Sequence, residues 1–210
     1  MCFSSKASFT AAAVLGVIAV ASLIKARKNP DRYLIAAMPL FFAIQQVSEG
    51  MQWLYLESGI GSQQAANAAS ELFLFIALVI WPFWTPLSVV VAEREREKRG
   101  LLYIFLGIGI LDSIYNAYVS LGNPMPASIA GHSIFYQLYV SQPSVWVYAI
   151  AVILPWFFTS TPKAKILGVG YALGYSIAAW FYFSTFASVW CFFAAINSAI
   201  IYAMVTSEER

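Results

Sequence analysis

The stretch QQVSEGMQW, residues 45–53, places a carboxylate and three glutamines inside a long apolar run. On an α-helix, Gln45, Glu49 and Gln52 share one face. A charged side chain at the centre of a bilayer costs at least about 2.5–3.5 kcal/mol, so such a face is expected to point into a helix bundle or a wet cavity. Glu49 is therefore a candidate functional residue. The structural alternative is an acid that only hydrogen-bonds to a neighbouring helix.

Four side chains together offer the chemistry of a transition-metal site: two thiols, a carboxylate and an imidazole. They are Cys2, Glu49, His132 and Cys191. Zinc takes such ligands, usually four of them in a tetrahedral shell. They follow no local spacing motif, so the prediction depends on the fold bringing them together. A Cys2–Cys191 disulfide, which an oxidising compartment would permit, is the alternative.

Two further acids are candidate catalytic residues. Asp112 lies one helical turn before Asn116, and Glu71 lies near the start of another apolar segment. Either acid could move a proton while metal-bound water attacks a lipid-like or small substrate. The structural alternatives are that Asp112 and Asn116 brace a helix kink, and that Glu71 is solvated at the membrane interface.

The composition predicts that membrane-spanning helices hold these residues. The chain has 210 residues, of which 60% are hydrophobic and 10% charged, whereas soluble domains are roughly 45–50% apolar and 25% charged. Because a spanning helix needs about 20 mostly apolar residues, the sequence predicts an all-α polytopic bundle that forms a single domain over residues 1–210. The seven predicted spans are 8–25, 33–56, 68–92, 100–121, 144–160, 166–184 and 186–205.

The basic residues predict the orientation of this bundle. All but one of the 12 Lys and Arg residues fall on one side of the predicted layout, the exception being Lys6. Cytoplasmic loops retain Lys and Arg, so the amino end is predicted to lie outside and the carboxyl end in the cytoplasm. All six candidate site residues then lie toward the outer end of the bundle.

Two other segments are expected to be structural. EREREKR, residues 93–99, is interpreted as a solvated helical extension in which Glu95 and Arg99 pair at i,i+4. Gly170, Gly174 and Ala178 form a stripe of small residues, which is typical of close helix packing in membranes.

The segments MCFSSKASF, QQVSEGMQW, GHSIF and SVWCFFAA resemble an uncharacterised family of bacterial multi-span membrane proteins. The resemblance extends over nearly the whole chain, and its motifs contain Cys2, Glu49, His132 and Cys191. It implies a location in the bacterial inner membrane, where the predicted site would face outward. It supplies no mechanism.

The sequence leaves three functions open. The first is a membrane metalloprotein, extending to a metal-dependent hydrolase. The second is an accessory subunit that binds lipid or quinone, braced by the disulfide; the 17% aromatic content favours it. The third is a transporter or proton path that uses Glu49 and Asp112. Membrane lipids and other membrane proteins are the expected partners, and no basic patch interleaved with aromatics points to nucleic acid.

Overall fold

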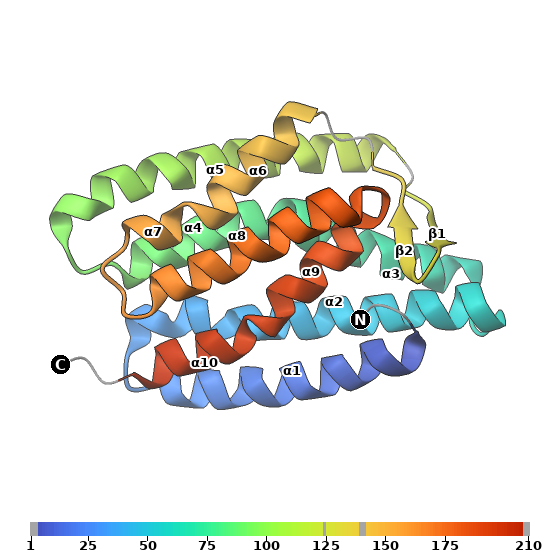
Figure 1. The fold of residues 1–210 in the computed structure, drawn as a ribbon, viewed down its shortest axis with the longest axis horizontal. Helices are drawn as coiled ribbons and strands as arrows, with labels where there is room; N and C mark the ends of the chain where they lie inside the picture. The colour runs from blue at the N-terminus through green and yellow to red at the C-terminus, as the bar shows by residue number, and fades with distance from the viewer. Residues whose placement is uncertain (1–3, 124, 139–141, 208–210) are drawn as a thin grey trace.

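The computed structural model describes residues 4–123, 125–138 and 142–207, and seven helical rods account for most of them. The rods run back and forth between two ends of the molecule (Figure 1). In chain order they are α1 (Ser5–Ala26); η1 (Pro30–Arg32) with α2 (Tyr33–Ser58); α3 (Gln63–Phe75), η2 (Ile76–Ile80) and α4 (Trp81–Ala92); α5 (Arg96–Gly122); α6 (Gln142–Ile153) with α7 (Pro155–Phe158); α8 (Ala164–Phe181); and η3 (Phe183–Thr185), α9 (Phe186–Ile196) and α10 (Ser198–Thr206).

Five of these rods are long and apolar enough to cross a membrane. They are Ser5–Ala26, Pro30–Ser58, Gln63–Ala92, Arg96–Leu121 and Phe183–Thr206. The apolar helix Ser144–Phe158 is shorter, and α8, with 18 residues, is not among the five. The seven predicted spans thus correspond to seven helical rods, of which five meet the length and hydropathy expected of a full span among the described residues.

A β-hairpin departs from the predicted all-α class. Strands β1 (Ala127–Ala130) and β2 (Ser133–Tyr136) pair antiparallel, with Ala130 opposite Ser133. Gly131, in the two-residue turn, has a φ of 61°, a conformation that glycine adopts without strain. The ring of Tyr136 stacks on Phe73 of α3 with centroids 4.8 Å apart, so the hairpin is packed against the bundle.

The two ends of the bundle differ in charge. The hairpin end carries β1–β2 and the links at residues 59–62 and 182–185, and the basic end carries the links at 27–29, 93–95 and 159–163 (Figure 1). All the described Lys and Arg residues except Lys6 lie in the links of the basic end or in the adjoining helical turns. The membrane orientation predicted from the sequence depends on this separation.

The stripe of small residues on α8 is confirmed as a packing surface. A Cβ atom added to Gly174 would lie 2.7 Å from the Cβ of Phe193 on α9, and one added to Gly170 would lie 2.2 Å from Oδ1 of Asn197. Asn197 separates α9 from α10 and donates through Nδ2 to the carbonyl of Phe193 at 3.2 Å. The glycines therefore let the last rod approach α8 closely.

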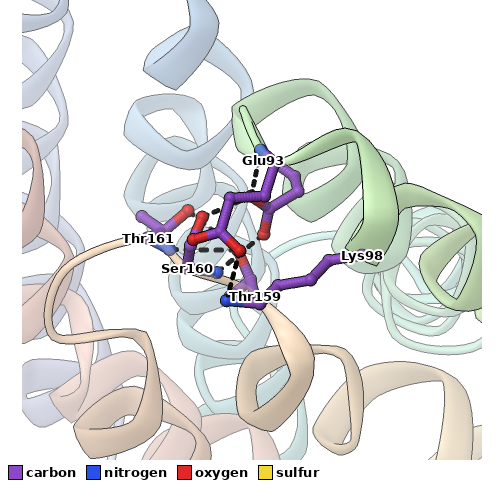
Figure 2. A network of polar contacts seen from close by, with 6 residues as sticks. Glu93, Lys98, Thr159, Ser160 and Thr161 are labelled. Carbon is purple, nitrogen blue, oxygen red and sulfur yellow. Dashed lines mark hydrogen bonds and ion pairs between the residues drawn. The ribbon is translucent and has the colours of Figure 1, made fainter.

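The basic end contains a buried carboxylate that the sequence analysis did not single out. Glu93 is fully buried, and its carboxylate accepts hydrogen bonds from the Ser160 N–H at 2.6 Å, the Glu95 N–H at 2.8 Å and the Ser160 hydroxyl. Figure 2 shows this link between the two loops. The Arg99 guanidinium donates to the Glu93 carbonyl at 2.9 and 2.7 Å.

The expected helical extension is correct for residues 96–99 but wrong for residues 93–95, and Glu95 does not pair with Arg99 as expected. The backbone is extended at Glu93 and Glu95, and α5 begins at Arg96. Arg99 binds the Glu93 carbonyl, while Glu95 pairs with Lys98 at 2.8 Å. The physical reason is that the buried Glu93 carboxylate gains three donors once the helix stops.

These hydrogen bonds set the ionisation of Glu93. Burial alone would raise its pKa, but the donors on Ser160 and Glu95 outweigh burial and lower the pKa from 4.5 to about 2. At the same end, the buried Arg32 caps α10 by donating to the carbonyls of Met204 and Ser207 at 2.8 and 2.9 Å. The basic end is thus fixed by backbone-directed hydrogen bonds.

Candidate functional site

Glu49 is fully buried, in the half of α2 nearer the hairpin end. Its carboxylate accepts a hydrogen bond from Nε2 of Gln46 at 3.3 Å and another from the hydroxyl of Ser188 on α9. Gln45 and Gln52, on the same face of α2, are also buried. The prediction that this face points into the bundle is confirmed.

Gln45 ties this face to three other helical segments. Its Nε2 lies 3.3 Å from the Phe73 carbonyl of α3 and 3.4 Å from Sγ of Cys191 on α9. Its Oε1 accepts from the indole Nε1 of Trp81, at the start of α4, at 3.0 Å. Because both ends of the amide are bonded, the orientation of Gln45 is fixed.

Cys191 is a free and buried thiol. Ser188 lies one helical turn before it on α9, and the two residues meet Glu49 and Gln45 respectively. We call this group of Gln45, Glu49, Ser188 and Cys191 the α2–α9 centre. The predicted alternative of a Cys2–Cys191 disulfide stays a prediction, because Cys2 lies outside the described residues.

Asp112 belongs to a second buried cluster, between α5 and α6. Its carboxylate accepts from Nδ2 of Asn116 at 3.0 Å and from the Ser144 hydroxyl at 2.9 Å. A cavity of about 50 Å³ is bordered by Asn116 and Ser144 of this cluster and by Cys191 of the α2–α9 centre. That volume exceeds the minimum for a water molecule, and the cavity borders one or more members of each cluster.

Residues in and next to the Asp112 cluster satisfy carbonyls that an irregular helix leaves unpaired. The π-helical segment η2 precedes Pro82. Because proline has no N–H, Pro82 cannot donate to the Leu78 carbonyl, four residues earlier. Nδ2 of Asn116 donates to that carbonyl at 3.2 Å, and the Ser113 hydroxyl donates to the Val79 carbonyl at 2.7 Å. This is how a bilayer helix tolerates such a break, since neighbours satisfy the freed carbonyls.

The other candidate residues lie elsewhere. Glu71 is exposed on α3 and lines a groove against the end of α5, away from the Phe73 carbonyl that Gln45 contacts. His132 is exposed in the hairpin turn and borders a cleft of about 650 Å³ with Tyr182 and Thr185. Cys2 lies outside the described residues.

The structure therefore brings two of the four predicted metal ligands, Glu49 and Cys191, to one centre. Within residues 4–123, 125–138 and 142–207, no group of three or more His, Cys, Asp or Glu side chains is arranged to hold a metal ion. The full four-residue ligand set remains a prediction, because one of its members is not described.

The sequence did not point to two contributors to the site, or to the contacts of a third. Ser188 lies three residues before Cys191, and that helical spacing was a signal for a shared face. Ser144 gave no signal, because a serine at the start of an apolar segment is common. The role of Gln45 as a clamp on Trp81 needed the helix rotations, which the sequence does not reveal.

The fold and the centre define a helical protein that has rods long and apolar enough to span a membrane and a polar cluster buried between them. The sequence matches a family of unknown function (DUF6629) over residues 1–210, and the chain belongs to that family. This confirms the resemblance to an uncharacterised family. No curated protein and no solved structure matches the chain.

Proposed function

We propose that the protein is an integral membrane protein in which the α2–α9 centre binds a transition-metal ion, with zinc as the first candidate. One observation carries the proposal: a carboxylate and a thiol from distant parts of the chain lie in one buried centre. Glu49 is hydrogen-bonded to Ser188, 139 positions away in the sequence. Cys191 is hydrogen-bonded to Gln45, 146 positions away. Thiolate and carboxylate are both zinc ligands, and the thiol must be deprotonated to bind.

Cys2 and His132 are the proposed further ligands. Two contacts support them. The ring of Phe9 in α1 lies so close to Gly50 that an added Cβ would be 2.8 Å from its Cε1, so the start of α1 adjoins the segment that carries Glu49. The strand β2 that follows His132 packs on α9, which carries Cys191.

The site is proposed to face outward, in a bacterial inner membrane. The support is the distribution of charge: the basic end, which contains nearly all the Lys and Arg residues, would be cytoplasmic under the positive-inside rule. Reporter fusions or cysteine accessibility at Lys6 and Lys98 test this orientation. The two positions should report opposite sides of the membrane, and a cytoplasmic location for both would overturn it.

Metal content is the direct test of the proposed function. The protein is purified without chelators, incubated with zinc and analysed for metal and for free thiols. About one zinc per chain is expected for the wild type, and Glu49→Gln and Cys191→Ser should each lose most of it. Cys2→Ser and His132→Ala test the two further ligands.

The matched control is Glu57→Gln, which changes an exposed acid at the far end of α2 and should leave the metal content unchanged. A wild type that retains no zinc, or a Cys191→Ser variant that retains all of it, would contradict the proposal.

A proton path is the second candidate function, favoured by the cavity between the α2–α9 centre and the Asp112 cluster. Asp112 is also the acid better placed for a hydrolytic reaction, since Asn116 and Ser144 connect it to that cavity while Glu71 faces a separate groove. Proton flux into vesicles that contain the protein distinguishes this function. It should fall in Asp112→Asn if the path exists and be absent in the wild type if it does not.

A further inference from the structure

A second candidate binding site lies on the side of the bundle, separate from the α2–α9 centre. It is a groove of about 530 Å³ between α3 and the end of α5, within the range of roughly 300–1,000 Å³ that is typical of small-molecule sites. Leu72, Phe75 and Leu121 are apolar lining residues with 45, 50 and 90% of their surface exposed.

The base of the groove is held in place by a buried residue and a hydrogen bond. Met125, which follows α5, is buried beneath it, and the hydroxyl of Ser70 in α3 donates to the Met125 carbonyl at 3.1 Å. α5 packs against α4 and η2 deeper in the bundle, so the groove occupies the space at the hairpin end of α3.

The polar lining residues of the groove all lie toward the hairpin end. Glu71, Ser120 and Asn123 lie there together with the apolar Ala68 and Leu121, whereas the deeper lining residues, Phe75 and Ala117, are apolar. This arrangement is suited to an amphiphile whose polar head lies near the membrane surface and whose chain runs toward the bilayer centre.

Charge indicates which head group the groove accepts. Glu71 is the one ionisable side chain among its described lining residues. The described hairpin end also carries the exposed acid Glu57, and its one Lys or Arg is Lys6. A carboxylate in such surroundings favours a cation, whereas a phosphate head would meet no basic side chain in the described lining.

We propose that this groove binds a single-chain amphiphile with a primary ammonium head, which Glu71 holds by a charge-assisted hydrogen bond. Ser120 and Asn123 offer further polar contacts to the head, and Phe75, Leu72 and Ala117 contact the chain. This site is independent of metal binding, because Glu71 faces away from the α2–α9 centre.

Equilibrium binding of radiolabelled dodecylamine to the purified protein in nanodiscs tests the site. Competition is measured with unlabelled dodecylamine, 1-dodecanol, dodecanoate and phosphatidylethanolamine. We expect saturable binding of the amine, about tenfold or more tighter than the alcohol, since the bond to a charged group is lost with the alcohol. Dodecanoate and phosphatidylethanolamine should compete more weakly than the amine.

Variants locate the binding. Glu71→Gln should abolish the preference for the amine over the alcohol, while the matched control Glu57→Gln, another exposed acid at the same end, should keep it. Ala117→Phe, which fills the groove, should weaken the binding of the amine and of the alcohol equally. The proposal is overturned by non-saturable binding, by equal affinity for amine and alcohol, by an unchanged preference in Glu71→Gln, or by phosphatidylethanolamine competing as well as the amine.

Discussion

Two carboxylates are completely buried among the described residues, Glu49 near the hairpin end and Glu93 at the basic end, and their surroundings differ. Glu93 accepts from two backbone N–H groups and one hydroxyl, and the backbone donors cannot turn away. Two of the donors to Glu49 are side chains, an amide and a hydroxyl, that can rotate. At equal burial, Glu93 is therefore held by backbone donors that cannot reorient, whereas at least two of the donors to Glu49 can.

The largest effect that tests this comparison is expected from Glu93→Gln. Both carboxylate oxygens accept bonds, so the new NH₂ group must face a donor that cannot reorient. We expect a loss of roughly 2–4 kcal/mol in the free energy of unfolding, measured by denaturant titration in detergent. Glu97→Gln, which changes an exposed acid in the same charged run, is the control and should change stability by less than about 0.5 kcal/mol.

The pH dependence of unfolding sharpens the same point. The folded-state pKa of Glu93 is lowered to about 2 from 4.5, so its contribution is fully present above pH 5 and is lost as the pH falls toward 2. The loss should be on the order of 2–3 kcal/mol. Unfolding free energies measured between pH 7 and 2.5 should show this decline in the wild type and a smaller one in Glu93→Gln. Equal declines would contradict the assignment.

Asp112→Asn is expected to have an intermediate effect, about 1 kcal/mol. Its partners are again side chains, and the Ser144 hydroxyl can turn to donate to Oδ1 of Asn116, 3.2 Å away, while accepting from the new amide. The same denaturant titration measures it. A loss as large as that of Glu93→Gln would show that this cluster is as rigid as the basic end.

The smallest effect on stability is expected from Glu49→Gln, less than about 1 kcal/mol. Oε1 of Gln46 is buried without a hydrogen-bond partner, so rotation of the Gln46 amide would let that atom accept from the new NH₂ group, and the number of unpaired buried groups would not rise. Unfolding of the metal-free protein is the measurement, and the metal content of the same variant should fall sharply. Destabilisation equal to that of Glu93→Gln would show that the donors to Glu49 are as fixed as those to Glu93.

The helices were predictable from hydropathy and charge, but their interruptions were not. The predicted span 33–56 corresponds to α2, Tyr33–Ser58, because a long apolar run has one stable arrangement in lipid. The hairpin at residues 127–136 was missed, since two four-residue strands give little signal in a long polar link. The break at Glu93 was missed because its donors come from Ser160, 67 positions away.

The position of the candidate site residues along the bundle was predictable, but the rotation of each helix about its own axis was not. The face of Gln45 and Glu49 followed from helical spacing within one segment, and the structure confirms it. Whether Glu71 and Asp112 join that face depends on how α3 and α5 turn about their own axes. Side-chain packing sets that rotation, and no spacing rule within a single span contains it.

The π-helical segment η2 has a consequence for how the chain tolerates changes in length. Eight residues separate Phe73 from Trp81, and in a regular α-helix they would lie about 80° apart around the axis, yet Gln45 contacts both. The wider π turn absorbs that excess rotation. Deletion of one residue between Ile76 and Ile80 would leave seven, which a regular helix aligns to within about 20°. The rod can therefore lose one residue within η2 and keep its contacts with α2. A deletion elsewhere in the rod would turn those contacts away.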